Sequence, residues 1–424
     1  MKKLLKKFIP DWLLGTYHFA LALSGALICG FPSRKLKVIG VTGTKGKSTV
    51  VILAGKVLEG GGKKVGWVSS LTINDGKVEI MNPYHMTMPG RFFIQKTLAQ
   101  MVKNGCEYAL VEVTSEGIKQ YRHKFINFFG AVFTNLAPEH LEAHGGFANY
   151  RAAKEKLFAA AAKNKESFGV YNLDDDNVGE FLKYDIKKKI GYGIKGQNSN
   201  SKIQISNVNL SASGSVFNLD NVNFKTSLLG EFNVANCAAA AAVGQACGVK
   251  LEEASRAMAK IEAIPGRLEI INEGQNFTVV VDLAHTPDSY EKVFKLFQGL
   301  PHNKIIAVFG SAGGGRDKWK RPELGKIASE YSDVLIICNE DPYDESPEEI
   351  CQQIAAGCKK TQPEIILNRR QAILKGLSLA QTGDIVLFLG KGTEQTYVEG
   401  KNKIKWDDRD VAREELRKLT DINK

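Results

Sequence analysis

The residues with the clearest chemical meaning lie in one short stretch, residues 38–49. An apolar run there leads into a glycine-containing loop that ends in Lys47-Ser48-Thr49, and an apolar segment of helical character follows over residues 50–58. A loop between a strand and a helix N-terminus presents backbone N–H groups and the positive end of the helix dipole to an anion. Lys47 can neutralise terminal phosphates, and the hydroxyl of Ser48 or Thr49 can bind Mg²⁺. The stretch therefore predicts a phosphate-binding loop.

The loop has a narrower pattern than the usual phosphate loop. Six residues before Lys47, where that pattern has glycine, stands Val41, with Gly40 and Gly43 on either side. The alternative interpretation is a glycine-rich strand-to-helix turn with an accidental lysine. Because the strand, loop and helix signals agree, we favour the phosphate loop. Its expected contacts are Gly43, Thr44, Lys45, Gly46, Lys47, Ser48 and Thr49.

Polar clusters also follow other apolar runs, where open α/β sheets place their ligands. Glu112 stands just past such a run and is a natural Mg²⁺ ligand beside a phosphate loop, although a solvated strand-end glutamate is the alternative. His140 and His144 have the i, i+4 spacing of a metal pair, or of a helix-capping arrangement with Glu139, and spacing alone identifies no third ligand. Residues 310–322 combine a glycine-rich turn with several cations, which suits an anion or carboxylate.

A mainly parallel α/β architecture is needed to hold these residues. Apolar runs bounded by turn residues alternate with helical patterns, as in sheets with crossover helices. Residues about 196–226 instead alternate in short pairs and predict a meander at a sheet edge. Pro265-Gly266 ends a helix and marks a boundary before a second α/β unit. The predicted strands include residues 108–113, 131–134, 278–281, 305–309, 334–338 and 385–389, and the predicted helices residues 150–163, 235–247, 323–330 and 347–357.

Composition narrows the class of protein. The 424 residues are 43% hydrophobic and 24% charged, as in globular proteins of two or three domains. A net charge of +11, spread along the chain, suits anionic substrates such as nucleotides and acidic peptides. No basic stripe is interleaved with aromatic residues, so we expect no nucleic-acid partner. The seven cysteines are scattered without a C-x-x-C pair, which fits a reducing cytosol.

The N-terminal segment is unusual. Four lysines within the first seven residues precede an uncharged segment, residues 12–31, that ends before Arg34 and Lys35. Its length is near that of a membrane span. Three interpretations stay open: a spanning helix, a helix lying on the membrane surface, and a helix packed on the protein. A cleaved signal peptide is disfavoured, because the phosphate loop follows shortly and must stay in the cytosol.

The ordered series of motifs resembles that of the Mur ligases, the ATP-dependent amino acid ligases of peptidoglycan synthesis, and most of all their tripeptide synthetases. The resemblance covers about residues 37–415, and because the motifs keep one order the chain is identified as a member of this family. The motifs are residues 42–49, Glu112-Val113-Thr114-Ser115, Thr134-Asn135-Leu136 with His140 and His144-Gly145, Tyr150 to Lys154, Asn172-Leu173-Asp174-Asp175, Gly230 to Asn236, Pro265-Gly266-Arg267, Asp282 to Asp288, Arg316 to Pro322, Gly390 to Glu394 and Asp407-Asp408-Arg409.

The resemblance implies the fold and the reaction. It implies a P-loop central domain with a mainly parallel sheet over residues 37–264 and a Rossmann-like C-terminal α/β domain, which binds the amino acid, over residues 265–424. A hydrophobic segment, residues 1–36, stands before them. ATP, with Mg²⁺, would phosphorylate the carboxylate of a muramoyl-peptide-type acceptor, and the amine of a free amino acid would then displace the phosphate to form an amide. Such an enzyme would be cytoplasmic and monomeric, with membrane-surface contact through residues 1–36 as a further possibility.

The resemblance also assigns roles to residues. Lys47 would hold the phosphates, and Ser48 with Glu112 one Mg²⁺. His140 resembles the ligand of a second Mg²⁺, and Lys154 the lysine that the family carbamylates beside that ion, although a plain surface lysine is the alternative. The nucleotide contacts implied are Asn236, Arg267, Asp282 and His285, and the amino-acid contacts are Arg316, Asp341, Tyr343, Gly390 and Glu394.

Departures from the family pattern leave the substrates open. The residues before the central domain are too few for the family's uridine-binding domain, so we expect that domain to be missing. Members that add meso-diaminopimelate carry Asp-Asn-Pro-Arg where this chain has Glu340-Asp341-Pro342-Tyr343, and we therefore expect lysine or another amino acid without the distal carboxylate. Thr393 and Glu116 each replace a histidine. The other interpretations are a folylpolyglutamate- or cyanophycin-type amide ligase and a non-catalytic ATP-binding subunit.

Overall fold

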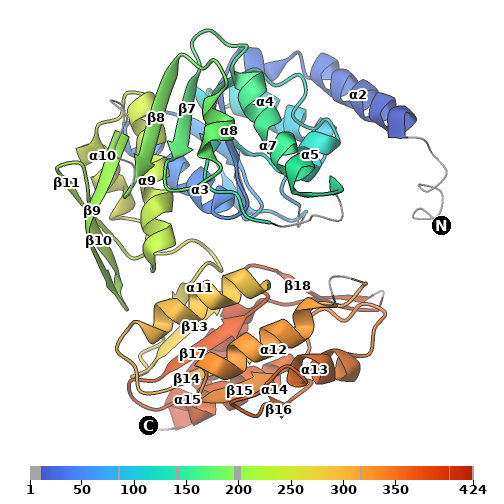
Figure 1. The fold of residues 1–424 in the computed structure, drawn as a ribbon, viewed down its shortest axis with the longest axis vertical. Coiled ribbons are helices and arrows are strands. Elements are labelled where there is room, and N and C mark those ends of the chain that lie inside the picture. The colour runs from blue at the N-terminus through green and yellow to red at the C-terminus, as the bar shows by residue number, and fades with distance from the viewer. Residues whose placement is uncertain are drawn as a thin grey trace. The chain divides into compact units, whose positions relative to one another are not determined.

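The computed structural model describes residues 11–84, 86–138, 144–194, 202–315, 318–400 and 402–422. The chain divides into two compact units, shown in Figure 1. The first comprises Met1–Leu210 and Gly214–Glu262, and the second comprises Ala263–Lys424 with Ser211–Ser213.

The first unit is built on an eleven-stranded sheet in the order β11-β10-β9-β8-β7-β6-β1-β5-β2-β3-β4. Its middle is parallel, and antiparallel strands occupy both edges, including the meander predicted from the sequence. The strands are β1 (Lys37–Thr42), β2 (Val65–Val68), β3 (Thr72–Asn74), β4 (Glu79–Met81), β5 (Tyr108–Glu112), β6 (Phe128–Phe133), β7 (Phe168–Asn172), β8 (Lys188–Gly193), β9 (Lys202–Ser211), β10 (Gly214–Leu219) and β11 (Val222–Thr226).

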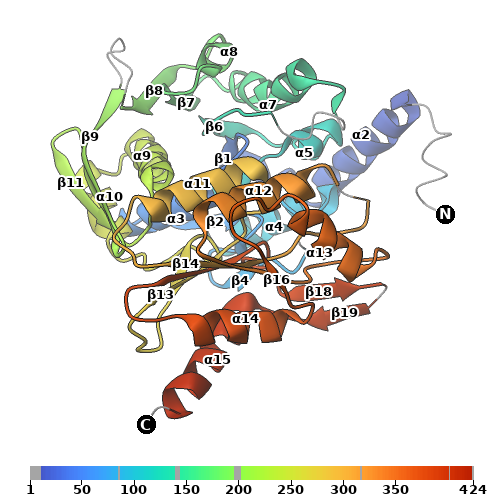
Figure 2. The same cartoon turned by 60° about the horizontal axis from the view of Figure 1, so that its bottom comes forward.

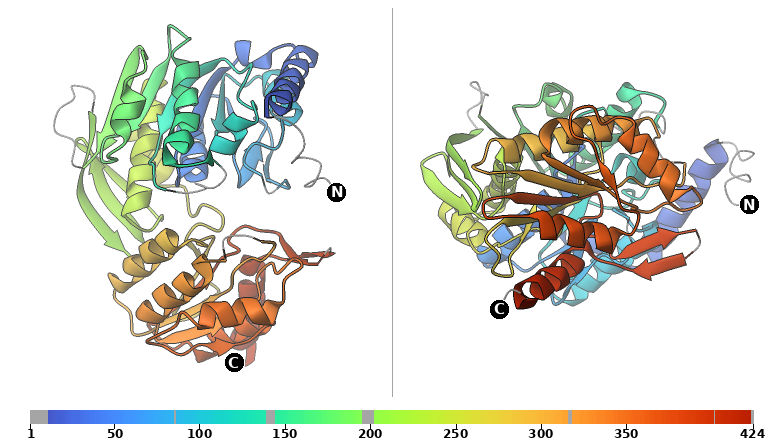
Figure 3. Two further views of the ribbon diagram at one scale, coloured as in Figure 1. Left: turned by 45° about the vertical axis from the view of Figure 1, so that its right-hand side comes forward. Right: turned by 90° about the horizontal axis from the view of Figure 1, so that it is seen from below.

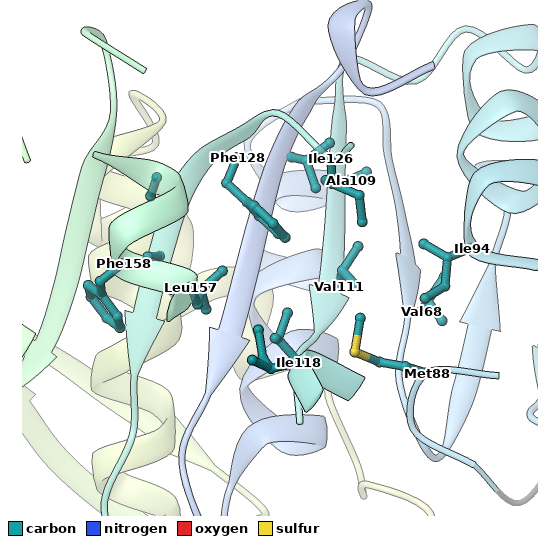
Figure 4. Close-up of a cluster of buried hydrophobic side chains, with 14 of the residues drawn as sticks. Val68, Met88, Ile94, Ala109, Val111, Ile118, Ile126, Phe128, Leu157 and Phe158 are labelled. Carbon is teal, nitrogen blue, oxygen red and sulfur yellow. The ribbon is translucent and has the colours of Figure 1, made fainter. Parts of the chain in front are cut away.

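Helices cover both faces of this sheet, which explains why a central strand such as β5 is buried at every position rather than at alternate ones. One core contains Val111, Phe128 and Leu157, between the sheet and the helices α4, α5 and α7 (Figure 4). Helices α3, α9 and α10 pack on one another. The helices are α3 (Lys47–Gly60), α4 (Arg91–Lys103), α5 (Ser115–Lys119), α7 (Phe147–Ala161), α8 (Val178–Leu182), α9 (Glu231–Ala246) and α10 (Leu251–Met258).

The second unit has a six-stranded sheet in the order β12-β13-β17-β14-β15-β16, parallel except for β12. Helices α14 and α15 share a buried core with one face, while α11 and α12 lie on the other (Figure 2). The fold class predicted from the sequence is confirmed. The elements are β12 (Glu269–Ile271), β13 (Thr278–Asp282), α11 (Pro287–Gln298), β14 (Ile305–Phe309), α12 (Lys320–Tyr331), β15 (Val334–Ile337), α13 (Pro347–Ala355), β16 (Glu364–Ile365), α14 (Arg369–Leu379), β17 (Ile385–Leu389), the hairpin β18 (Thr396–Glu399) and β19 (Asn402–Lys405), and α15 (Asp408–Ile422).

The uncharged N-terminal segment forms α2 (Asp11–Ile28), followed by the short turn η1 (Pro32–Arg34). The left view of Figure 3 shows α2, in dark blue, against other helices of the first unit. It packs on α4, and Ala22 and Ala26 are buried there. Of the three interpretations, the structure therefore has the helix packed on the protein. Within the described ranges, no helix combines the length and the apolar character needed to cross a membrane.

Candidate active site

The predicted phosphate loop joins β1 to α3 and depends on two glycines. Gly46 has a φ of 81°, and a Cβ there would lie 2.4 Å from Oδ1 of Asn236. A Cβ on Gly43 would lie 2.0 Å from Oγ1 of Thr134. Side chains at either position would therefore collide with neighbours or strain the backbone. The glycines let the loop lie against the ends of β6 and α9.

Asn135, just after β6, holds the loop in place. The N–H of Lys45 donates to Oδ1 of Asn135 at 2.9 Å, and the N–H of Thr44 donates to its carbonyl at 2.8 Å. In return, Thr134 Oγ1 and Asn135 Nδ2 donate to the carbonyl of Lys45 at 2.7 and 3.1 Å. These two loop N–H groups are thus engaged internally. The N–H groups left for a phosphate are those of the first turn of α3, which have no acceptor within the helix.

Lys47, the first residue of α3, extends back over the loop. Its Nζ donates to the carbonyl of Thr44 at 2.8 Å. The ammonium group is therefore held next to the helix N-terminus, where an anion would bind. This is the position that the sequence predicted for phosphate neutralisation.

Ser48 and Glu112 meet beside the loop. The parallel register pairs Val41 with Glu112, which brings the end of β5 next to the loop. Ser48 Oγ donates to Glu112 Oε2 at 2.8 Å, and both side chains are buried. Ser70, which the sequence analysis did not single out, also belongs to this cluster. Its N–H donates to the same Oε2 at 2.8 Å, and its Oγ lies 2.7 Å from Ser48 Oγ.

This cluster fits Mg²⁺, because hydroxyl and carboxylate oxygens are the ligands that the ion prefers. Among the residues whose placement is described, no group of three or more His, Cys, Asp and Glu side chains could hold a metal. Mg²⁺ is commonly bound by one or two carboxylates together with water and the phosphates of a nucleotide, and Glu112 with the hydroxyl of Ser48 would suit such an ion. When bound, it would neutralise phosphate charge.

Lys154 lies at the loop rather than on the surface. It is 2% exposed, and its Nζ donates to the carbonyl of Gly43 at 2.6 Å. The same Nζ is 4.4 Å from the ring centroid of Tyr150, whose hydroxyl lies 3.2 Å from Oγ1 of Thr44. The ring of His144 is 5.4 Å from that of Tyr150. His140, the other predicted metal ligand, lies outside the described residues.

In the second unit, Asp282 ends β13 and is buried. Its carboxylate accepts the N–H groups of Leu268 at 2.8 Å and Ala284 at 2.7 Å. Burial raises the pKa of Asp282, although the positive charge of Arg267 and the hydrogen bonds from these N–H groups act to lower it. His285 follows on the surface, with Nδ1 2.7 Å from the carbonyl of Leu283. The three predicted nucleotide contacts of this unit therefore gather near the carboxyl end of β13.

A buried lysine that the sequence analysis did not select organises the loop after β17. Lys391 Nζ donates to both oxygens of Asp341 at 3.0 Å, to Glu394 Oε2 at 2.8 Å and to the carbonyl of Thr396 at 2.7 Å. Burial disfavours the charged ammonium group and by itself lowers the pKa of Lys391. The negative charges of Glu394 and Asp341 outweigh this effect, so the pKa of Lys391 is raised. Its position directly after an apolar strand, between two glycines, was the signal available in the sequence.

Two of the predicted amino-acid contacts, Asp341 and Glu394, bind this lysine directly. Asp341 also accepts the N–H of Val398 at 2.8 Å, so its carboxylate fixes the loop. Glu394 keeps a partly exposed side chain. Tyr343 has a φ of 53°, and its carbonyl accepts the N–H of Gly400 at 2.8 Å. Arg316 lies outside the described residues.

Glu340, next to Asp341 in the chain, is a buried carboxyl group that lacks a full set of hydrogen bonds among the described residues. It is 5% exposed, and within the described part of the chain its Oε2 has no hydrogen-bond partner. A Cβ on Gly390 would lie 2.5 Å from that oxygen. Burial raises the pKa of Glu340 to about 7, although Arg369 and Lys391 oppose the shift.

A phosphate loop with a hydroxyl, a carboxylate and a lysine beside it defines a nucleotide-binding α/β protein. Comparison with known proteins is more specific. The family described as Mur ligase middle domain matches residues 41–244, and the one described as Mur ligase, glutamate ligase domain matches residues 266–392. The chain belongs to the Mur ligase family, whose members are ligases.

Individual relatives agree. The chain is 38% identical over 398 residues to UDP-N-acetylmuramyl-tripeptide synthetase of Borreliella afzelii, covering 92% of this chain and 78% of that protein. It is 36% identical over 416 residues to UDP-N-acetylmuramoyl-L-alanyl-D-glutamate–2,6-diaminopimelate ligase of Geobacillus kaustophilus, covering 96% and 84%.

Solved structures give the same result. A UDP-N-acetylmuramoyl-L-alanyl-D-glutamate–2,6-diaminopimelate ligase aligns with a TM-score of 0.65 at 28% identity, over 91% of this chain and 79% of that one. Folylpolyglutamate synthase of Mycobacterium tuberculosis, solved with ADP, aligns with a TM-score of 0.69 at 17% identity, over 88% and 91%. The second likeness concerns the fold alone.

Proposed function

We propose that this protein is an ATP-dependent ligase that joins a free amino acid to a muramoyl-peptide precursor in peptidoglycan synthesis. The observation that carries the proposal is the buried constellation of Ser48, Glu112 and Lys154 around the phosphate loop. The curated relatives named as tripeptide synthetases and diaminopimelate ligases supply the substrate class.

In the proposed reaction the chain mainly positions and neutralises charge. Lys47 and the first turn of α3 would bind the phosphates of ATP, and Ser48 with Glu112 would hold Mg²⁺. An acceptor carboxylate attacks the terminal phosphorus and releases ADP. The amine of the amino acid then attacks the acyl phosphate, loses its proton and expels phosphate. The nucleotide contacts that we propose are Asn236 in the first unit and, in the second, Arg267, Asp282 and His285 near the end of β13.

We propose that Lys154 works as a carbamate. Carbon dioxide would add to its neutral amine with loss of a proton, which turns a cation into an anion next to the loop. Together with His140 it would then suit a second Mg²⁺. In the unmodified state, the 2.6 Å bond to the carbonyl of Gly43 already holds Nζ at the loop.

We propose that the amino acid lacks a distal carboxylate, as lysine does. Tyr343 stands where an arginine would form two parallel hydrogen bonds to that carboxylate, and a phenol cannot do so. Arg316 would bind the α-carboxylate and Glu394 the amine, close to Gly390. We propose a cytoplasmic monomer that contacts the membrane surface through residues 1–36.

The experiment is a ligation assay with UDP-linked and lipid-linked muropeptides and a panel of amino acids. Its readouts are the release of phosphate and the mass of the product. Lys47→Ala should abolish turnover because phosphate charge is no longer neutralised. Lys326→Ala, an exposed lysine on α12, is the matched control and should be active. Ligation by Lys47→Ala at the wild-type rate, or no muropeptide-dependent phosphate release by the wild type, would reject the proposal in favour of a non-catalytic subunit or another acceptor.

A further inference from the structure

Helix α2 has two different faces, and one of them is packed on the protein. A Cβ added to Gly15 would lie 3.7 Å from the ring of Tyr121, and one added to Gly25 would lie 3.5 Å from Cα of Phe92, so both glycines lie close to these neighbours. Ala22 is buried on the same side. These residues are seven and three positions apart, which places them on one side of the helix as a stripe. This stripe fixes α2 to α4 and to the loop after α5.

The opposite face is apolar and exposed. Leu13 is 45% exposed, Tyr17 58%, Leu27 58% and Ile28 73%. They too recur at helical spacing, and residues 12–31 carry no charge. An exposed apolar surface of this kind usually marks an interaction site. We call Leu13, Tyr17, Leu27 and Ile28 the α2 face.

Positive charge follows α2 directly in the chain. Arg34 and Lys35 are exposed just after α2, and the Arg34 guanidinium lies 4.5 Å from the ring centroid of Phe31. Lys37 follows, also exposed. In the sequence, four further lysines come before residue 8. An uncharged apolar stripe with cations next to it is the pattern of helices that lie in the interface of an anionic membrane.

We propose that the α2 face binds the surface of an anionic lipid bilayer, with α2 lying in the plane of the interface. A second copy of the chain is a poorer occupant, since it would bring the same positive charges together. A spanning orientation conflicts with the packed stripe, because Ala22 and Gly25 already face α4. The α2 face shares no residue with the phosphate-loop site. The inference rests on the membrane contact proposed above and adds the side chains that would make it and the charge of the lipid that they would bind.

The test is flotation of the full chain with vesicles of phosphatidylcholine, alone or mixed with phosphatidylglycerol. We expect binding to the mixed vesicles that weakens as salt is added. Arg34→Gln/Lys35→Gln should weaken it about thirtyfold, from the usual attraction per basic residue at such a surface. Leu27→Glu/Ile28→Glu should weaken it at least about tenfold, since it puts charge into the apolar face. Ile365→Glu/Ile404→Glu, at exposed apolar positions of the second unit, is the matched control and should bind like the wild type.

Several results would overturn the inference. One is a wild-type chain that floats with neither vesicle, or equally well with both. Another is a Leu27→Glu/Ile28→Glu variant that binds like the wild type while circular dichroism shows it folded. A dimer in analytical ultracentrifugation that this variant abolishes, without vesicle binding, would assign the α2 face to a second copy instead. Flotation needs neither ATP nor acceptor, so its outcome is independent of the ligation assay.

Discussion

Glu340→Gln should stabilise the protein at pH 8 and leave its stability nearly unchanged at pH 4. The carboxyl of Glu340 is buried, one of its oxygens has no partner within the described residues, and its pKa rises from an ordinary 4.5 to about 7. The folded state therefore binds a proton more tightly than the unfolded state does. Stability is highest below pH 4.5, falls as the pH rises toward 7, and stays reduced above it. Each pKa unit is worth about 1.4 kcal/mol, so the ionised glutamate costs about 3 kcal/mol at pH 8.

Glutamine keeps the size of Glu340 and removes its ionisation. Urea unfolding of the full chain at pH 4 and pH 8, followed by circular dichroism, gives the difference in free energy of unfolding at each pH. Glu364→Gln, at an exposed position on β16, is the control and should not change the pH dependence. An equal effect of Glu340→Gln at both pH values would refute the reasoning, because the cost would then have nothing to do with ionisation.

Three further outcomes are expected in the ligation assay. Glu112→Gln should keep the hydrogen bonds from Ser48 and Ser70 but raise the Mg²⁺ concentration for half-maximal rate by about tenfold or more, and an unchanged Mg²⁺ titration would remove Glu112 from the ion's ligands. Lys154→Ala should lose about a hundredfold in kcat and regain part of it with added short-chain carboxylates, whereas full activity would show that no carbamate is needed. The kcat/KM for lysine should exceed that for meso-diaminopimelate by about tenfold or more, and Tyr343→Arg should reduce this ratio. A wild-type preference for diaminopimelate would contradict the proposed choice of amino acid.

The sequence predicted the elements that depend on local signals. Continuous apolar runs such as residues 305–309 became buried parallel strands with the same bounds, because a strand covered on both faces must be apolar throughout. Strand β6 starts at Phe128 rather than Ala131, since the residues before Ala131 are apolar as well. The segment over residues 12–31 gave a helix, but its uniform hydrophobicity could not indicate which side would pack on α4.

Contacts between distant residues could not be predicted in the same way. Ser70 reaches Glu112 only because β2 and β5 are neighbours in the sheet, and nothing local distinguishes Ser70 from other turn serines. Lys391 resembles a loop lysine in the sequence, whereas in the fold it is buried among four acceptor oxygens. Such roles follow from strand order, which a single sequence leaves open.

The strand order also accounts for the contacts that hold the phosphate loop. Strand β1 lies between β5 and β6, so both neighbouring strand ends reach the loop, Glu112 from one side and Asn135 from the other. Asn135 accepts the N–H of Thr44 with its carbonyl oxygen and the N–H of Lys45 with its side-chain oxygen. These two N–H groups would otherwise be free to turn toward a phosphate. An anion therefore meets a preformed helix N-terminus with Lys47 across it. In the proposed reaction, a loop held in this way would cost little binding energy to order, which would leave more for the charge that develops during phosphoryl transfer.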